Sequence, residues 1–244
     1  MNATLASLTA DHPALGKLLS SSELQGRTGR KISTRGFSTL NNLWVLKCLF
    51  SEIKPSQTLE VGMALGASAT LFSSLHRKHN PQAAGAHHAI DPFQTEHYDN
   101  CTPRFLEENN LGDVTVLHEK LSSLVLPSLA ERGLKFGLIY IDGSHLFENT
   151  FIDFYYSAML CEIGGLIALD DCRDSHGLKV VRFVRTNLQD FFEEVSPYRY
   201  QVGPKIKRLL KQTLAKPLGQ QQMVLFRKKR DGSRDWNTSK LAAF

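Results

Sequence analysis

The sequence of 244 residues contains few cysteines and no long apolar run. Its four cysteines stand far apart and form no CxxC pair, which argues against a disulfide framework or a zinc site and favours a reducing cytoplasm. Apolar stretches such as LIYI at 138–141 and GGLIAL at 164–169 are too short to cross a bilayer, and the N-terminus lacks the basic region of a signal peptide. We therefore expect a cytoplasmic globular protein without a transmembrane segment.

Three motifs of common enzyme classes are also missing. The GxGxxG fingerprint, the P-loop lysine motif and the GxSxG elbow do not occur in the sequence. Their absence disfavours an NAD-dependent oxidoreductase, a P-loop nucleotide-binding protein and a serine hydrolase, respectively.

Positive charge exceeds negative charge, with 29 Lys+Arg against 24 Asp+Glu, and it gathers in residues 27–35, 204–216 and 227–230. Such runs are usually solvated surface, but they can also attract an anionic substrate, a nucleic acid or a membrane face. Aromatic residues do not interleave these runs, so a base-stacking platform is not indicated and nucleic acid is an unlikely partner.

Short β-rich segments alternate with helix-length amphipathic segments along most of the chain. The expected strands are 58–62, 87–91, 114–118, 136–142, 165–170, 198–202 and 222–226, and the expected helices are 68–79, 103–110, 120–132, 145–161 and 176–192. This alternation predicts an α/β fold with a doubly wound, Rossmann-like sheet of about seven strands.

Residues 1–57 give no strand signal, and we expect a helical cap or lid there. Within it, Ser38 is expected to cap a helix that ends at Ile53. The main domain is expected over 58–230, followed by a loose tail over 231–244.

The loop after the first expected strand reads LEVGMALGASAT, residues 59–70. Glycines at 62 and 66 would let a ligand approach the backbone and the first N–H groups of the next helix. The acidic residue just before Gly62 suits a ligand that has an ammonium group and no phosphates. Asp91 ends the second strand, where a carboxylate can accept two hydrogen bonds from a ribose. The alternative is an Asp-Pro turn, because Pro92 follows.

Three carboxylates follow the fourth and fifth expected strands, namely Asp142 and the pair Asp170 and Asp171. Two unit charges about 4 Å apart repel by about 4 kcal/mol at an effective dielectric constant near 20. Protonation, basic partners or a cation must offset that repulsion, and oxygen ligands suit Mg²⁺ or Mn²⁺. The alternative is that Asp170 or Asp171 caps a helix or a turn, a role that Asp174 could fill instead.

His145 lies three residues after Asp142, where we expect the first turn of a helix. A helix N-terminus disfavours a protonated imidazole, so a neutral His145 could accept a proton as a general base. The alternatives are a half-buried histidine bonded to a strand end, or a residue that orients a metal or substrate.

Four segments, EVGMALGAS, AIDPF, FGLIYIDGSH and GGLIALDDC, resemble in order and spacing the motifs of class I S-adenosylmethionine-dependent methyltransferases. More narrowly, they resemble metal-dependent O-methyltransferases of sugars and macrolides, with catechol O-methyltransferase as a more distant relative. The resemblance covers about residues 57–172. It implies S-adenosylmethionine as cofactor, Mg²⁺ or Mn²⁺ as metal, and the strand order 3-2-1-4-5-7-6 with an antiparallel last strand.

The resemblance also implies roles for individual residues. The cofactor would be held by Glu60, Gly62, Gly66 and Ser68 at its methionine end, Asp91 at the ribose, Glu119, Lys120 and Leu121 at the adenine, and Asp142. The metal would be held by Asp142, Asp170 and Asp171, and the catalytic residues would be His145, as general base, and Asp142.

The implied reaction is O-methylation of a hydroxyl on a small molecule such as a sugar, a polyketide or a catechol. A metal-independent or nitrogen-directed methyltransferase and a non-catalytic binding module are the alternatives. A homo-oligomer is possible, and the sequence does not identify the methyl acceptor.

Overall fold

The computed structural model describes residues 3–200, 221–235, 237 and 240–244. The strands among them are β1 (Glu23–Gln25), β2 (Lys31–Ser33), β3 (Thr58–Val61), β4 (His87–Ile90), β5 (Thr115–His118), β6 (Phe136–Ile141), β7 (Cys161–Leu169), β8 (Phe192–Val195) and β9 (Val224–Lys228). The helices are α1 (Ala3–Asp11), α2 (Pro13–Ser20), α3 (Leu40–Ile53), α4 (Ala67–His79), α5 (Cys101–Glu108), α6 (Ser122–Glu131), α7 (Phe147–Leu160), α8 (Ser175–Asn187) and the 3₁₀ turn η1 (Pro197–Arg199).

The strand order confirms the predicted topology. A seven-stranded sheet has the order β5-β4-β3-β6-β7-β9-β8, which is 3-2-1-4-5-7-6 when its strands are counted along the chain. Strand β9 runs antiparallel to both β7 and β8, whereas the pairs β3–β4, β4–β5 and β6–β7 are parallel. The chain therefore has the Rossmann-like α/β fold expected from its alternating pattern.

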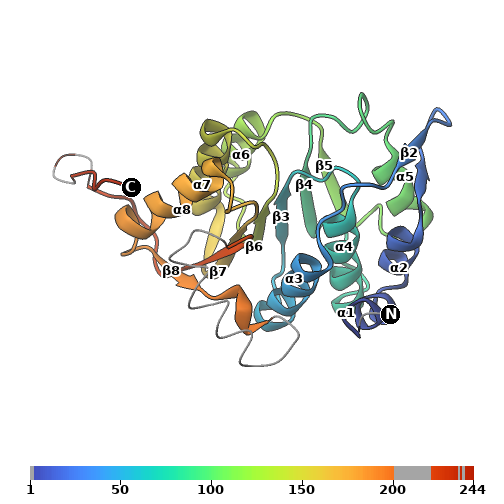
Figure 1. Ribbon diagram of the computed structural model, residues 1–244, viewed down its shortest axis with the longest axis horizontal. Coiled ribbons are helices and arrows are strands. Elements are labelled where there is room, and N and C mark those ends of the chain that lie inside the picture. Colours follow the sequence, from blue (N-terminus) through green and yellow to red (C-terminus); the bar gives the residue numbers. More distant parts are fainter. Residues whose placement is uncertain (1–2, 201–220, 236, 238–239) are drawn as a thin grey trace. The chain divides into compact units, whose positions relative to one another are not determined.

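The chain forms two compact units, Met1–Val125 and Leu126–Phe244. In the first unit every residue of β3 and β4 is buried, as parallel strands covered on both faces should be. Helix α4 packs on β4, and α2 and α3 pack in turn on α4 (Figure 1). This packing fixes the loop between β3 and α4, which carries the glycine motif.

The N-terminal segment differs from the expected purely helical cap, because β1 and β2 form an antiparallel hairpin. Each strand has only three residues, and of β1 only Leu24 is buried, so the sequence offers no hydrophobic alternation to detect. Helix α3 ends at Ile53 as predicted, but its N-cap is Thr39 and not Ser38. The Thr39 hydroxyl accepts a hydrogen bond from the Asn42 N–H at 3.2 Å, the usual capping geometry.

In the second unit, α7 packs on β6, β7 and α8 (Figure 1). The strand expected over 198–202 is wrong in place, because the pairing strand is β8 and Tyr198 lies in a 3₁₀ turn. Residues 201–202 and the basic segment 204–216 lie outside the described residues. In β8 the apolar Phe192 and Val195 flank two glutamates, so no period-two pattern marks it.

The expected division into a cap over 1–57, a main domain over 58–230 and a tail over 231–244 stays a prediction. Within the part of the chain that the structure describes, no helix is long and apolar enough to pass through a membrane. All four cysteines are free, and three of them are buried.

Candidate functional site

The glycine loop of the first unit joins β3 to α4 through left-handed backbone. Gly62, Ala64 and Gly66 have φ values of 92°, 43° and 78°. The Gly62 N–H donates to the Ile90 carbonyl at 2.9 Å, and the Gly66 N–H donates to the Met63 carbonyl at 2.8 Å. Gly66 is the N-cap of α4 and supplies no side chain, so the first N–H groups of the helix face the loop without a side-chain cap.

Asp91 holds this loop from the end of β4. One carboxylate oxygen accepts from the Ala64 N–H at 2.6 Å and from the Gln94 amide at 3.1 Å, and the other accepts from the Phe93 N–H at 2.8 Å. The Phe93 bond is the side-chain turn that the Asp-Pro alternative anticipated. The Gln94 amide and the Thr102 hydroxyl both donate to the Ala64 carbonyl at 2.8 Å. Asp91 therefore positions the loop, whatever else it binds.

Glu60 is the outlier of this unit, because it lies in the middle of β3 and is 0% exposed. Among the described residues, neither of its carboxylate oxygens makes a hydrogen bond. Burial raises the pKa of Glu60 to about 8, the charge of Asp91 adds to that rise, and the Ser68 hydroxyl opposes it. A buried acceptor pair with no close donor is costly, so this carboxylate favours a ligand that brings donors to it.

A buried chain of polar groups lies behind Glu60. His87 places Nε2 at 3.5 Å from a Glu60 oxygen, and its Nδ1 lies 2.9 Å from the Thr58 hydroxyl. The same hydroxyl lies 2.9 Å from His76 Nε2. Burial lowers the pKa of His87 to about 3, so it stays neutral, and its tautomer decides whether it offers Glu60 a proton or a lone pair. The sequence analysis assigned no role to His87. Pairing β3 with β4 places His87 opposite Thr58, and this register could have pointed to the contact.

The residues expected to border an adenine lie after β5. Glu119 accepts from the Thr95 N–H at 2.5 Å and from the Thr95 hydroxyl at 2.8 Å. Lys120 is exposed, and Leu121 is 55% exposed. An exposed leucine beside a turn held by Glu119 gives an apolar surface at this edge of the first unit.

In the second unit, Tyr140 and Gln222 connect the three expected carboxylates. The Tyr140 hydroxyl lies 2.9 Å from an Asp142 oxygen and 2.6 Å from an Asp170 oxygen. The Gln222 amide donates to Asp170 at 3.0 Å and to Asp171 at 2.5 Å. Burial raises the pKa of Asp170 against these hydrogen bonds. The repulsion expected between the acids is thus offset by protein donors and by a tendency of Asp170 to stay protonated.

His145 lies outside α7 and not in its first turn, because the helix begins at Phe147 after the N-cap Leu146. The helix-end argument for a neutral imidazole therefore does not apply as stated. The side chain is 63% exposed, with Nε2 at 3.5 Å from Asp171 and Nδ1 at 3.9 Å from Asp174. The His176 ring is near it, with ring centroids 5.1 Å apart. Sequence reasoning missed His176, since two histidines 31 positions apart carry no spacing signal.

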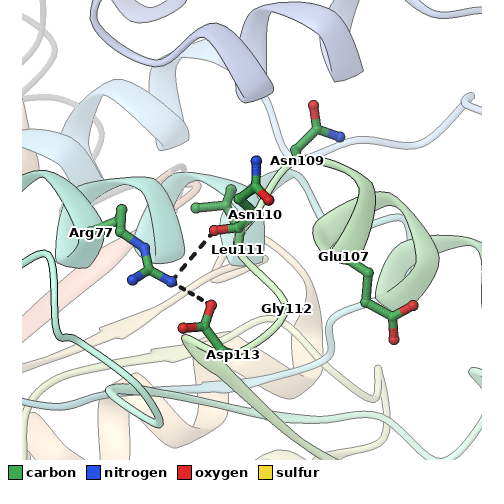
Figure 2. Close-up of a pocket in the computed structure, with 7 residues that line it drawn as sticks. All are labelled: Arg77, Glu107, Asn109, Asn110, Leu111, Gly112 and Asp113. Atoms are coloured by element: carbon green, nitrogen blue, oxygen red, sulfur yellow. Dashed lines mark hydrogen bonds and ion pairs between the residues drawn. The ribbon is translucent and has the colours of Figure 1, made fainter.

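A surface pocket elsewhere in the first unit contains none of the expected site residues (Figure 2). Figure 2 shows Arg77 directed at the backbone of Asn110 and at the Asp113 carboxylate. The guanidinium also donates to the Pro81 carbonyl at 2.5 Å. Arg77 connects the chain segments around this pocket, so we assign the residues there a structural role and no role in binding or catalysis.

A Gly66→Ala substitution should cost about 2–5 kcal/mol of stability. The backbone strain of φ 78° contributes about 1–2 kcal/mol, and the new Cβ would overlap Thr102 Cγ2, which adds about 1–3 kcal/mol. Gly133→Ala is the matched control, because its φ is 72° and its Cβ would meet open space. Denaturant unfolding of both variants, and of Gly66→Ala with Thr102→Ser, measures the two parts. Equal losses at both glycines would show that the close packing is unimportant.

A Glu60→Gln substitution should flatten the pH dependence of stability between pH 6.5 and 8. A carboxyl whose folded pKa is about 8 gives stability that is present at low pH and is lost as pH rises through 8. The lowered pKa values of His76 and His87 act below pH 6.5 and leave this window clear. Denaturant unfolding of wild type and variant at both pH values tests this. An unchanged difference between the two pH values in Glu60→Gln would contradict a raised pKa.

The chain is similar to known proteins in one domain family and in its fold. Residues 59–172 match the model of a methyltransferase domain family. No match emerged among curated protein sequences. The matched segment begins in β3 and ends just after the Asp170–Asp171 pair, so it contains both the glycine loop and the acidic strand ends.

Three solved structures share this fold. The O-methyltransferase TomG of Streptomyces achromogenes, in complex with SAM, is 14% identical, with 94% of this chain and 91% of that chain covered and a TM-score of 0.58. A putative O-methyltransferase of Klebsiella pneumoniae is 16% identical, with 94% and 91% covered and a TM-score of 0.58. An O-methyltransferase of Bacillus cereus, in complex with SAH, is 15% identical, with 80% and 83% covered and a TM-score of 0.53. Residues 59–172 therefore resemble a methyltransferase domain, and the chain shares the fold of these O-methyltransferase structures.

Proposed function

We propose that this chain is an S-adenosylmethionine-dependent methyltransferase that acts on a hydroxyl of a small molecule. The methyltransferase domain over 59–172 and the O-methyltransferases of the same fold, two of them bound to SAM or SAH, support the class of reaction. The observation that carries the proposal is Glu60, a fully buried carboxylate without a donor beside a glycine loop.

The first unit would hold the methionine end of the cofactor. The ammonium of an amino-acid moiety supplies the charge and the donors that Glu60 lacks, and its arrival would ionise the carboxylate. Gly62 and Gly66 give the loop its left-handed backbone, and the N–H groups at the start of α4 would suit the carboxylate of the same moiety. Ser68, in the first turn of α4, would stabilise the ionised form of Glu60.

Asp91, Glu119, Lys120 and Leu121 would hold the nucleoside part. Asp91 already accepts three hydrogen bonds from its own unit, so a ribose would share a carboxylate that also fixes the loop. Leu121 offers the apolar surface that an adenine ring needs.

The second unit would act on the methyl acceptor, with His145 as general base. The cofactor supplies an electrophilic methyl group on a sulfonium. His145 would take the proton of the acceptor hydroxyl on a ring nitrogen, so that the oxygen can bond to the methyl carbon as the carbon–sulfur bond breaks. Asp171, at 3.5 Å from His145 Nε2, would stabilise the imidazolium that forms. Asp142, expected as a further catalytic and cofactor residue, accepts a hydrogen bond from Tyr140.

A Mg²⁺ or Mn²⁺ ion on Asp142, Asp170 and Asp171 stays a prediction. The donors are oxygens, as these ions prefer, but Tyr140 and Gln222 already occupy them. Among the described residues, these three acids do not form a group whose ligand atoms all lie within 4.8 Å of one another. In this arrangement, the three carboxylates do not fit a bound Mg²⁺ or Mn²⁺ ion.

The basic hairpin of the first unit gives little support for an anionic acceptor. Arg27 pairs with Glu107 at 2.5 Å, and Lys31 pairs with Glu23 at 3.1 Å. Arg30 donates to the His97 carbonyl at 2.6 Å. Since three of its cations already have protein partners, we favour a neutral hydroxylated acceptor such as a sugar, a polyketide or a catechol.

Calorimetric titration of S-adenosylmethionine into the full chain tests the proposal directly. Wild type should bind, and Glu60→Gln and Asp91→Ala should each weaken binding by about 10- to 100-fold, because a hydrogen bond to a charged group is worth about 1.5–3 kcal/mol. Glu131→Gln, an exposed glutamate, is the control. Absence of binding by folded wild-type protein, with or without Mg²⁺, would favour a non-catalytic binding module instead.

A His145→Ala variant should lower kcat by about 10²–10⁴-fold, the usual share of a general base, and leave S-adenosylmethionine affinity unchanged. Methyl transfer to panels of sugars, catechols and amines measures this, with His97→Ala as the exposed-histidine control. A full rate in His145→Ala would remove the base from the proposal. Transfer to amines alone would indicate a nitrogen-directed enzyme, and activity that survives EDTA would indicate a metal-independent one.

A further inference from the structure

We propose that His145, Asp174 and His176 bind one divalent transition-metal ion of the zinc type, at a site distinct from the Asp142, Asp170 and Asp171 set. Within the described residues, these three are the group whose ligand atoms all lie within 4.8 Å of one another. They come from the loop that follows β6 and from the start of α8, so two chain segments of the second unit converge on one point.

The separation of the three side chains is close to what coordination requires. Ligands about 2.0–2.1 Å from a tetrahedral Zn²⁺ lie roughly 3.4 Å from one another. His145 Nδ1 and an Asp174 oxygen are 3.9 Å apart. Both side chains are more than 60% exposed, whereas His176 is buried.

The side chain of Asp174 gives independent support for a metal site, because it does not cap helix α8. Asp174 is the N-cap residue of α8, where an aspartate normally accepts a hydrogen bond from the helix N–H groups. Its side chain makes no such bond. The carboxylate is instead directed toward His145, which leaves its oxygens available to a ligand.

The surroundings suit a single ion. A small cavity of about 10 Å³, the space of one water-sized sphere, adjoins the group: His145 and His176 line it together with Asp142, Asp170 and Asp171, whereas Asp174 is not part of its lining. The Asp171 oxygen at 3.5 Å from His145 Nε2 would orient the imidazole if Nδ1 bound the metal, as carboxylates do for metal-bound histidines. The nearby carboxylates of Asp142, Asp171 and Asp174 also make the site electronegative.

The donor set selects the kind of ion. Two imidazoles and one carboxylate suit Zn²⁺, Co²⁺, Ni²⁺ or Fe²⁺, whereas Mg²⁺ prefers oxygen ligands alone. Three protein ligands leave a fourth position open for water or a small ligand. The consequence for catalysis rests on the proposed function: an ion bound to His145 would remove the base, so saturating Zn²⁺ should inhibit methyl transfer.

Titration of Co²⁺ and Zn²⁺ into the metal-free full chain tests the site without any assay of activity. Co²⁺ should give visible ligand-field bands of a four- or five-coordinate ion, and Zn²⁺ should displace it at one equivalent. His176→Ala and Asp174→Asn should each weaken Zn²⁺ binding by more than about 100-fold, because even an outer partner of a metal ligand contributes roughly 10–100-fold. Asp171→Asn should have the smaller, outer-partner effect.

His97→Ala and Asp190→Asn are the matched controls, because both residues are exposed and neither belongs to the group. They should bind Zn²⁺ as wild type does, and circular dichroism should show that every variant is folded. Unchanged binding in both His176→Ala and Asp174→Asn would overturn the proposal, as would binding lost in Asp142→Asn alone. If Zn²⁺ binds as expected but does not inhibit methyl transfer, the base assignment of His145 is wrong and the metal site stands.

Discussion

The fully buried carboxylate of Glu60 is the constraint around which the first unit is arranged. A carboxylate in the middle of a covered strand is costly as an ion, and the chain meets this cost by a pKa raised to about 8. Nearby, Thr58 ties His76 and His87 into one polar chain that ends at Glu60. In the proposed function, the ammonium group of the cofactor would ionise this carboxylate, so the residue that is costly to bury is also the residue that binds.

The second unit meets the same electrostatic difficulty in another way. Its acids are not isolated but share donors, with Tyr140 between Asp142 and Asp170 and Gln222 between Asp170 and Asp171. These contacts reduce the repulsion between the carboxylates. They leave Asp174 and the two histidines as the group open to a metal, and His145 as the residue common to the proposed catalysis and the proposed metal site.

The parts of the fold predicted from sequence are those with strong hydrophobic periodicity. Near-continuous apolar runs marked β6 and the 165–169 part of β7, and the strand order 3-2-1-4-5-7-6 is confirmed. The hairpin β1–β2 and strand β8 were missed because short strands with one or two buried residues carry no period-two signal. The glycine loop and the acidic strand ends could be placed from local motifs. The roles of His87, Tyr140, Gln222 and His176 could not, because each depends on a contact between segments distant in the sequence.

The most direct test of the account is the number of protons released when S-adenosylmethionine binds. At pH 6.5 the ligand's α-amino group, with an ordinary pKa of about 7.7–8.0, is already protonated, while Glu60 is still neutral. Calorimetry in buffers of different ionisation enthalpy should therefore report release of about one proton by wild type and none by Glu60→Gln. Binding by wild type without proton release would contradict the claim that a neutral Glu60 ionises to receive the ammonium group.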